Sequence, residues 1–227
     1  MSTTSPVLEK AAPAAPRIPR FTAAQRILHL ILALTFFGML WTGLCLWSPA
    51  LAEVMNRPLA KQWHLWFAIA LGVAFVGILI LRPRDVAAFA KEVDTVDRAD
   101  REWLKGGLRR IVNHEGAPEQ GWLNAGQKLN TAITIGLLIV LTFTGLLLWL
   151  GEKNTTFRFT GTVDVHDIAT ILIVLLVSGH LYLAIFNPST RASLSGMTNG
   201  SVDREWARAN HRRWVEECEA QEPDDRS

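Results

Sequence analysis

Two histidines lie inside the last long apolar stretch of the chain, residues 165–186, with His166 near its start and His180 beyond its middle. About 20 apolar residues cross a bilayer as a helix, and ionisable side chains inside such a helix usually mark a cofactor, an ion path or a proton relay. The 14 positions between the two histidines return to within roughly 40° of the starting direction and rise about 21 Å. Both imidazoles are therefore expected on one helix face, one near each membrane surface.

Two further histidines match these two depths. His29 stands at the start of the first apolar stretch and shares the level of His180, whereas His64 opens the second stretch. The outer level therefore holds His64 and His166. Two pairs of neutral imidazoles facing each other across a bundle are typical axial ligands of two haem irons. A histidine that only bonds a backbone carbonyl is the plainer interpretation for one such residue, but four in matched pairs favour cofactor binding.

A bare zinc or copper ion suits this pattern less well. The two histidine pairs are roughly 20 Å apart by helix rise, and no Cys, Asp or Glu joins them at the cytoplasmic level. Asp167, beside His166, is the one acid nearby. Haem propionates are anionic, so Arg26 and Lys61, each one turn before a histidine, are candidate partners. Histidine on both sides of an iron leaves no open position, which favours electron transfer over oxygen chemistry.

The composition predicts an all-α integral membrane four-helix bundle. Hydrophobic residues make up 49% of the chain and are gathered in blocks, which is typical of a membrane protein. We expect a flexible N-terminal segment (1–25), a four-span domain (26–187) with a cytoplasmic loop (82–128), and a cytoplasmic tail (188–227). The expected spans are 27–47, 63–81, 131–150 and 165–186.

Positive charges predict the orientation. Of the 23 Lys and Arg residues, four lie in residues 1–26, nine in 82–128 and six in 187–227. Cytoplasmic flanks of membrane helices carry an excess of Lys and Arg. Both termini and the middle loop are therefore expected in the cytoplasm, with the chain crossing a bacterial inner membrane several times.

Several polar or small residues have two interpretations. Thr42-Gly43 and Thr144-Gly145 suit close helix packing or the approach of a flat ring. Asn124, before the third span, either caps that helix or contacts a cofactor. In the tail, Asp203 is expected to cap a helix that places Trp206 and Trp214 on one side, where they would dock another segment or protein.

The chain resembles the cytochrome b (gamma) subunit of membrane-bound, quinone-reducing formate dehydrogenases from about Arg17 to Trp214. The motifs that carry the resemblance are Arg26-x-x-His29, His64, Asn124-Ala-Gly-Gln-Lys128, His166, Gly-His-x-Tyr-x-Ala around His180, Gly196-Met197, Trp206-Ala207 and His211-Arg-Arg-Trp214.

The resemblance implies two b haems, one held by His64 and His166 and the other by His29 and His180. It also implies an iron–sulfur (beta) subunit that feeds the outer haem and a molybdenum- or tungsten-pterin (alpha) subunit that oxidises formate. A quinone, either ubiquinone or menaquinone, would accept the electrons near the cytoplasmic face. The residues that the resemblance places beside this quinone are His180, Asn124, Gly126 and Gln127.

Two other classes of function remain open from the sequence. The cytochrome b of a quinone-linked hydrogenase or of a thiosulfate reductase would use the same haem chemistry. A transporter or assembly anchor would use the histidines for protons or packing. Transporters often break their helices at the bilayer midplane, and none of the four stretches has a central Gly/Pro interruption. Membrane lipid is an expected partner, and nucleic acid is not.

Overall fold

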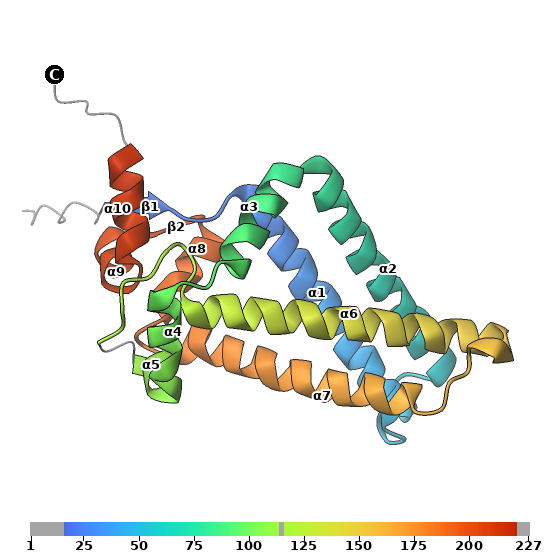
Figure 1. Ribbon diagram of the computed structural model, residues 1–227. Helices are drawn as coiled ribbons and strands as arrows, with labels where there is room; N and C mark the ends of the chain where they lie inside the picture. Colours follow the sequence, from blue (N-terminus) through green and yellow to red (C-terminus); the bar gives the residue numbers. More distant parts are fainter. Residues whose placement is uncertain (1–15, 114–115, 222–227) are drawn as a thin grey trace, which may run out of the picture.

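Four long apolar helices dominate the computed structural model, which describes residues 16–113 and 116–221 (Figure 1). The mean hydropathy of their most apolar windows is 2.0 for the first and 2.4 for the other three, enough to cross a membrane. The helices are α1 (Ala23–Trp47), α2 (Arg57–Leu81), α6 (Ala125–Lys153) and α7 (Thr162–Leu181), the last continued by a π-helical turn, η3 (Tyr182–Phe186). The predicted all-α, four-span membrane fold is confirmed.

All four spans begin earlier than hydropathy alone predicts, and α1, α2 and α6 each begin at a polar residue whose side chain caps the helix. Thr22 and Gln25 form a capping box at the start of α1, and Asn124 and Gln127 form one at the start of α6. Such boxes satisfy backbone N–H groups that have no partner inside the helix. The helix-capping interpretation of Asn124 is thus confirmed. α7 instead follows Gly161, whose φ of 84° is a conformation that favours glycine.

The four spans form two hairpins. A short 3₁₀ turn, η1 (Leu51–Glu53), joins α1 to α2, and another, η2 (Thr155–Phe157), joins α6 to α7. Each helix packs mainly against its partner within the hairpin. A Cβ on Gly38 would lie 2.6 Å from the Phe67 ring, so glycine permits the close approach of α1 and α2.

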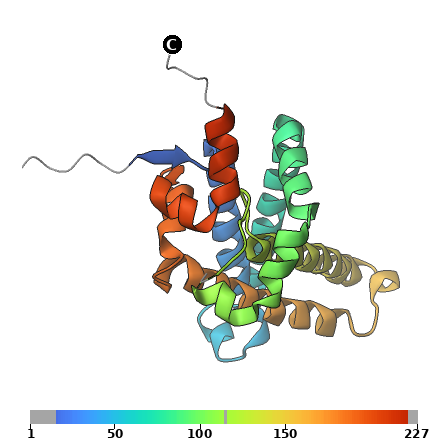
Figure 2. The ribbon, with the colours of Figure 1, turned by 60° about the vertical axis from the view of Figure 1, so that its left-hand side comes forward.

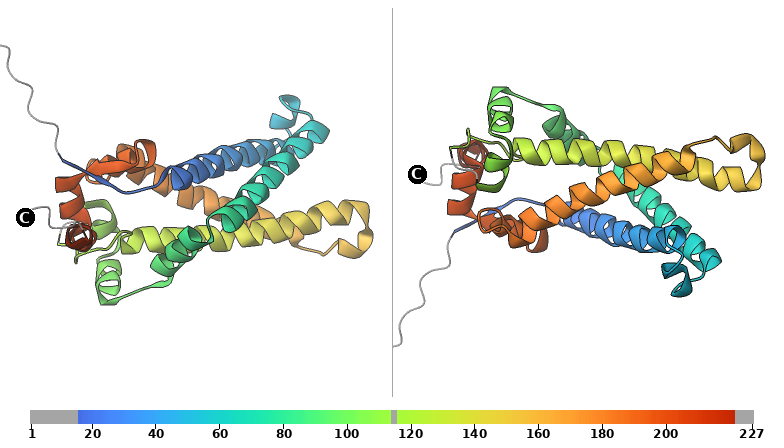
Figure 3. Two further views of the ribbon diagram at one scale, coloured as in Figure 1. Left: turned by 90° about the horizontal axis from the view of Figure 1, so that it is seen from above. Right: turned by 90° about the horizontal axis from the view of Figure 1, so that it is seen from below.

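The two connecting turns lie at one end of the bundle, which we call the loop side (residues 48–56 and 154–161) (Figure 3). The other end, the tail side, holds residues 16–22, 82–113, 116–124 and 187–221. On the loop side, Lys61 of α2 forms an ion pair with Glu152 of α6 and so links the hairpins. Lys61, expected beside a propionate, therefore has a carboxylate partner from the protein itself.

The middle segment forms three short helices on the tail side: α3 (Pro83–Asp94), α4 (Arg98–Lys105) and α5 (Gly107–Asn113). Trp103 of α4 is 2% exposed. Its ring lies against α6 where a Cβ on Gly126 would be only 2.7 Å away. Two residues further along α6, the Lys128 ammonium donates to Asp100 at 3.0 Å and to the Thr95 carbonyl at 2.9 Å. The middle segment is therefore locked against the start of α6.

The tail folds back onto the segment that precedes α1. A short strand, β1 (Arg17–Pro19), pairs antiparallel with β2 (Ser201–Asp203), and Figure 2 shows β1 beside the tail helices. Residues 17–19 are thus an ordered strand rather than part of the predicted flexible segment, since the stabilising partner is remote in sequence. Residues 1–15 lie outside the described part of the chain.

The tail helices enclose a small core. They are α8 (Leu194–Thr198), which follows the 3₁₀ turn η4 (Arg191–Ser193), α9 (Arg204–Asn210) and α10 (Arg212–Gln221). As predicted, the Asp203 side chain caps α9 by accepting a hydrogen bond from the Trp206 backbone N–H at 2.9 Å. The buried residues of this core are Ile18, Val202, Ala207, Trp214 and Val215. The tail therefore docks on the chain's own N-terminal strand.

Candidate functional site: two histidine pairs

The structure brings together both pairs of histidines that the sequence predicts. On the tail side, the rings of His29 (α1) and His180 (α7) have centroids 6.2 Å apart, at an interplanar angle of 55°. On the loop side, the rings of His64 (α2) and His166 (α7) lie 6.4 Å apart at 62°. We call these the tail-side pair and the loop-side pair. In both, α7 faces a helix of the other hairpin.

The spacing within each pair fits an iron atom between two imidazoles. Two imidazoles that bind one metal from opposite sides are joined by two metal–nitrogen bonds of about 2 Å each. With about 1 Å from each nitrogen to its ring centre, the two ring centres lie roughly 6 Å apart. Each pair offers two nitrogens and so leaves the four equatorial positions of an iron to a porphyrin. Within the described residues, no group of three or more His, Cys, Asp or Glu side chains could hold a bare ion. The donor set therefore suits haem.

Each loop-side histidine contacts a threonine of its own hairpin. His64 Nδ1 lies 3.0 Å from Thr42 Oγ1, and His166 Nδ1 lies 2.8 Å from Thr144 Oγ1. From the sequence these threonines are expected in helix packing or in contact with a flat ring, and this hydrogen bond is not predicted. The signal that could have found it is spacing, because threonine precedes histidine by 22 residues in both hairpins.

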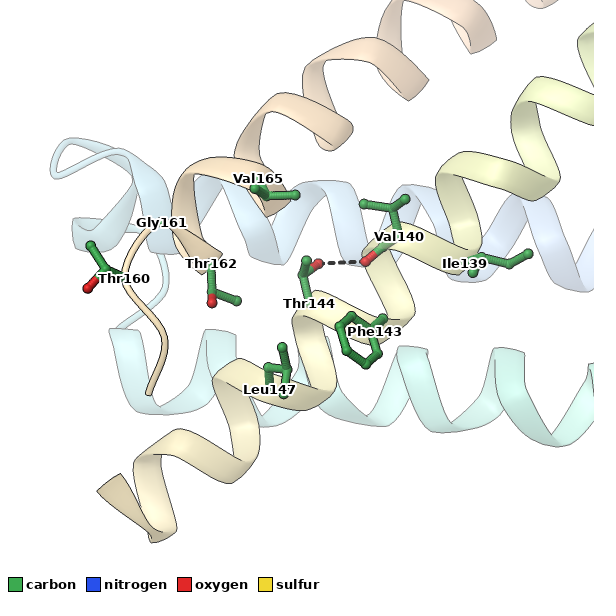
Figure 4. A pocket seen from close by; sticks show the side chains of 9 residues that line it. All are labelled: Ile139, Val140, Phe143, Thr144, Leu147, Thr160, Gly161, Thr162 and Val165. Atoms are coloured by element: carbon green, nitrogen blue, oxygen red, sulfur yellow. Dashed lines mark hydrogen bonds between the residues drawn. The ribbon is translucent and has the colours of Figure 1, made fainter. Parts of the chain in front are cut away.

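The glycines that follow these threonines lie next to the same histidines. An added Cβ on Gly43 or on Gly145 would lie 3.5 Å from the nearest carbon of the histidine ring. Beside the loop-side pair, α6 and the start of α7 also form an open apolar hollow (Figure 4). Its lining residues are Ile139, Val140, Phe143, Thr144, Leu147, Thr160, Gly161, Thr162 and Val165. Each loop-side histidine thus lies beside one threonine and one glycine of its own hairpin.

Arg26 lies one turn from His29 and ties α1 to the tail. Its Nη1 donates to the Thr198 carbonyl at 2.7 Å. Its Nε is buried and has no hydrogen-bond partner in the described part of the chain. A buried N–H group without a partner is suited to donate a hydrogen bond to an anionic group such as a haem propionate.

Asn124 and Gln127 use their amide oxygens to cap α6. Asn124 Oδ1 accepts from the Gln127 N–H at 2.9 Å, and Gln127 Oε1 accepts from the Asn124 N–H at 3.0 Å. Neither amide –NH₂ group donates to another described residue. The flat ring that approaches Gly126 is that of Trp103. The cap therefore leaves two amide donors at the tail-side end of α6.

A buried arginine connects this cap to the tail. Arg20 is 6% exposed, and its Nη2 lies 2.9 Å from His211 Nε2 and 3.4 Å from Gln127 Oε1. Its guanidinium also lies over the Trp206 and Trp214 rings, at 5.4 and 5.7 Å from their centroids. Burial lowers the pKa of Arg20 to about 10, so the group stays positively charged near neutral pH. The two tryptophans thus form a cation–π site for this charge.

Asp97 joins α4 to the last tail helix. Its carboxylate accepts a hydrogen bond from the Asp100 backbone N–H at 2.8 Å and another from Arg213 Nη1 at 2.5 Å. The bond from Asp100, together with the nearby Arg213 charge, holds the pKa of Asp97 below its usual range. The carboxylate therefore stays ionised to a lower pH than an ordinary aspartate, which favours the link to α10.

Fold and site together define the class: a multi-pass α-helical membrane protein whose two hairpins face each other through paired histidines. Residues 20–200 match the prokaryotic cytochrome b561 family, and the chain belongs to that family.

Its relatives include three formate dehydrogenase subunits. The chain is 27% identical over 209 residues to the formate dehydrogenase cytochrome b556(fdo) subunit of Escherichia coli K12, covering 88% of this chain and 92% of the relative. It is 26% identical over 213 residues to the nitrate-inducible cytochrome b556(Fdn) subunit of that strain, covering 90% and 93%. The cytochrome b556 subunit of Haemophilus influenzae is 24% identical over 209 residues, covering 88% and 83%. These relatives confirm the resemblance drawn from the sequence.

Proposed function

We propose that this chain is the membrane-anchoring cytochrome b subunit of a respiratory formate dehydrogenase, passing electrons from an iron–sulfur subunit through two b haems to a membrane quinone. The observation that carries the proposal is the presence of two histidine pairs, each bridging the hairpins, at opposite ends of the bundle. The family and the names of the relatives support the cytochrome b and formate dehydrogenase parts.

The residues assigned to the cofactors follow from this geometry. His64 and His166 would hold one haem, and His29 and His180 the other, with Arg26 beside the second. A haem ligated by two histidines supplies one-electron transfer without an open coordination position. The protein's own contribution is to fix the four imidazoles and to exclude water from the spans between them.

The partners and the orientation belong to the same proposal. The iron–sulfur subunit would dock on the loop side, next to His64 and His166, and the molybdenum- or tungsten-pterin subunit would oxidise formate beyond it. The excess of Lys and Arg in residues 1–26, 82–128 and 187–227 supports a cytoplasmic tail side in a bacterial inner membrane. Electrons would then move inward, toward the tail side.

Haem content tests the proposal directly. We expect the purified complex to yield two non-covalent b haems per copy of this chain by pyridine haemochrome analysis. The reduced-minus-oxidised spectrum should show six-coordinate, low-spin haem, because each histidine pair would supply two ligands to its iron. Fewer than one haem per chain in intact membranes would contradict the proposal.

Quinone reduction is assigned to the tail-side end of α6. A quinone that takes two electrons and two protons develops negative charge on its carbonyl oxygens before the protons arrive. Amide N–H donors aimed at those oxygens stabilise that charge more than they stabilise the neutral quinone. The –NH₂ groups of Asn124 and Gln127 are such donors, since the helix cap uses only their amide oxygens.

Replacing Asn124 by alanine should slow haem reoxidation by quinone roughly tenfold, the effect of one lost hydrogen bond to a developing charge. Reduction of the haems by formate should be unchanged. Stopped-flow absorbance of the pre-reduced complex mixed with a quinone analogue measures the rate.

Asn56→Ala is the matched control, because Asn56 caps α2 in the same way on the loop side. Each substitution should cost about 1 kcal/mol of stability through the lost cap. Reoxidation at the wild-type rate in Asn124→Ala would confine Asn124 to its capping role.

A further inference from the structure

The loop-side histidines are each held by a threonine whose own proton is already engaged. Thr42 Oγ1 donates to the Gly38 carbonyl at 2.8 Å. In the other hairpin, Thr144 Oγ1 donates to the Val140 carbonyl at 2.8 Å, as Figure 4 shows. A hydroxyl has one proton and two lone pairs, so each threonine oxygen faces its histidine as an acceptor.

This arrangement fixes the proton on the loop-side rings. Nδ1 of His64 and of His166 must carry the hydrogen, because each lies within hydrogen-bond distance of an accepting oxygen. Nε2 then carries the free lone pair that a metal requires. The same bond fixes the rotation of each ring, so both lone pairs are held in position before any ligand binds.

The tail-side pair lacks this support. Neither His29 nor His180 makes a hydrogen bond with any residue in the described part of the chain. The two sites therefore differ in the partners of their ligands, although both consist of two histidines. The difference matters chemically, because an acceptor at Nδ1 makes an imidazole a stronger electron donor.

We propose that Thr42 and Thr144 are positioning residues that set the loop-side haem at a lower reduction potential than the tail-side haem. The inference rests on the proposed function. Stronger donation from both imidazoles stabilises the more positive, oxidised iron and so lowers its potential. Electrons arriving one at a time at the loop side then move to the more oxidising tail side. Two such transfers supply the two electrons that, with two protons, convert a quinone to its quinol.

A potentiometric titration of the haem spectrum in the purified complex tests this inference. Valine replaces threonine with nearly the same shape but accepts no hydrogen bond. At the wild-type loop-side midpoint, Thr42→Val and Thr144→Val should each raise the ratio of reduced to oxidised loop-side haem roughly threefold to tenfold. The double variant should raise it further. A tenfold change corresponds to about 59 mV for a one-electron couple. The tail-side midpoint should not move.

Thr35→Val is the matched control. Thr35 is buried on the same helix as Thr42 and donates to the Ile31 carbonyl at 2.7 Å, but it makes no hydrogen bond with a histidine in the described part of the chain. This variant should leave both midpoints unchanged, whereas Thr42→Ser, which keeps the hydroxyl, should restore the wild-type value. Loss of the loop-side haem in Thr42→Val with recovery in Thr42→Ser would also support positioning.

Two outcomes would overturn the inference. One is an unchanged loop-side midpoint in the double valine variant with both haems bound. The other is loss of the haem in the serine variant as well as in the valine variant, which would assign the threonine to packing. Failure of the proposed function looks different, because the wild-type complex itself would then lack two bis-histidine haems.

Discussion

Alanine in place of His64 is expected to remove one of the two haems and to leave the other reducible. His166→Ala should remove the same spectral component, because the two rings face each other at 6.4 Å and neither faces the tail-side pair. The pair would then keep only one of the two imidazoles that would hold a haem, and within the described residues no group of three or more His, Cys, Asp or Glu side chains offers a replacement set. Haem content per chain and the low-temperature difference spectrum of the complex measure the result.

The tail-side pair provides the control for this experiment. His29→Ala and His180→Ala should each remove the other component, and the double variant His64→Ala/His166→Ala should lose no more haem than either single one. His64→Met distinguishes the loss of a ligand from misfolding. A methionine thioether can bind haem iron, so this variant should retain the haem with a raised reduction potential. If His64 and His180 variants lost the same component, the proposed pairing would be wrong.

The second large effect is expected at the buried ion pair between α6 and α4. Lys128 and Asp100 have side chains only 4% and 1% exposed. Lys128→Met leaves the Asp100 carboxylate buried without its cation, which should destabilise the protein by about 3–5 kcal/mol. Titration with a denaturing detergent, followed by circular dichroism, reports the change in the free energy of unfolding.

An exposed pair on the same helix as Asp100 calibrates that measurement. Lys105 and Glu102 are 72% and 47% exposed, so Lys105→Met should cost less than about 1 kcal/mol. Adding Asp100→Asn to Lys128→Met removes the stranded charge but keeps an acceptor for the Asp97 backbone N–H, and should recover most of the loss. Equal costs for Lys128→Met and Lys105→Met would show that the buried pair does not hold α4 to α6.

The sequence predicts the spans and the histidine pairs because both depend on local spacing. The length of the apolar stretches identifies the four helices. The 14-residue spacing of His166 and His180 is enough to place them on one helix face at two depths. The caps at Asn124 and Asp203 are likewise local, since each side chain bonds a backbone N–H three residues ahead. The side of the membrane on which the termini lie stays a prediction.

Other features depend on contacts between remote segments, and sequence reasoning misses these. Burial of Arg20 depends on Trp206, Trp214 and His211, which follow the last span. From the sequence alone, Arg20 is interpreted as one of the basic residues that flank the first membrane span. The roles of Thr42 and Thr144 are hidden for a different reason. Small residues in membrane helices commonly serve packing, so a hydrogen bond to a ligand's second nitrogen has no distinctive local pattern.

The strand pair β1–β2 also constrains the order of events during biosynthesis. Arg17 and Ser201, which bond across it, are 184 residues apart. At roughly 5–20 residues per second, about 10–40 s of translation separates the two strands. The chain has crossed the membrane four times before β2 emerges, so the tail side stays open while the hairpins insert. Closing the strand pair and burying Arg20 under Trp206 and Trp214 therefore come after all four spans have been synthesised. An N-terminal fusion that blocks β1 would disturb that last step rather than membrane insertion.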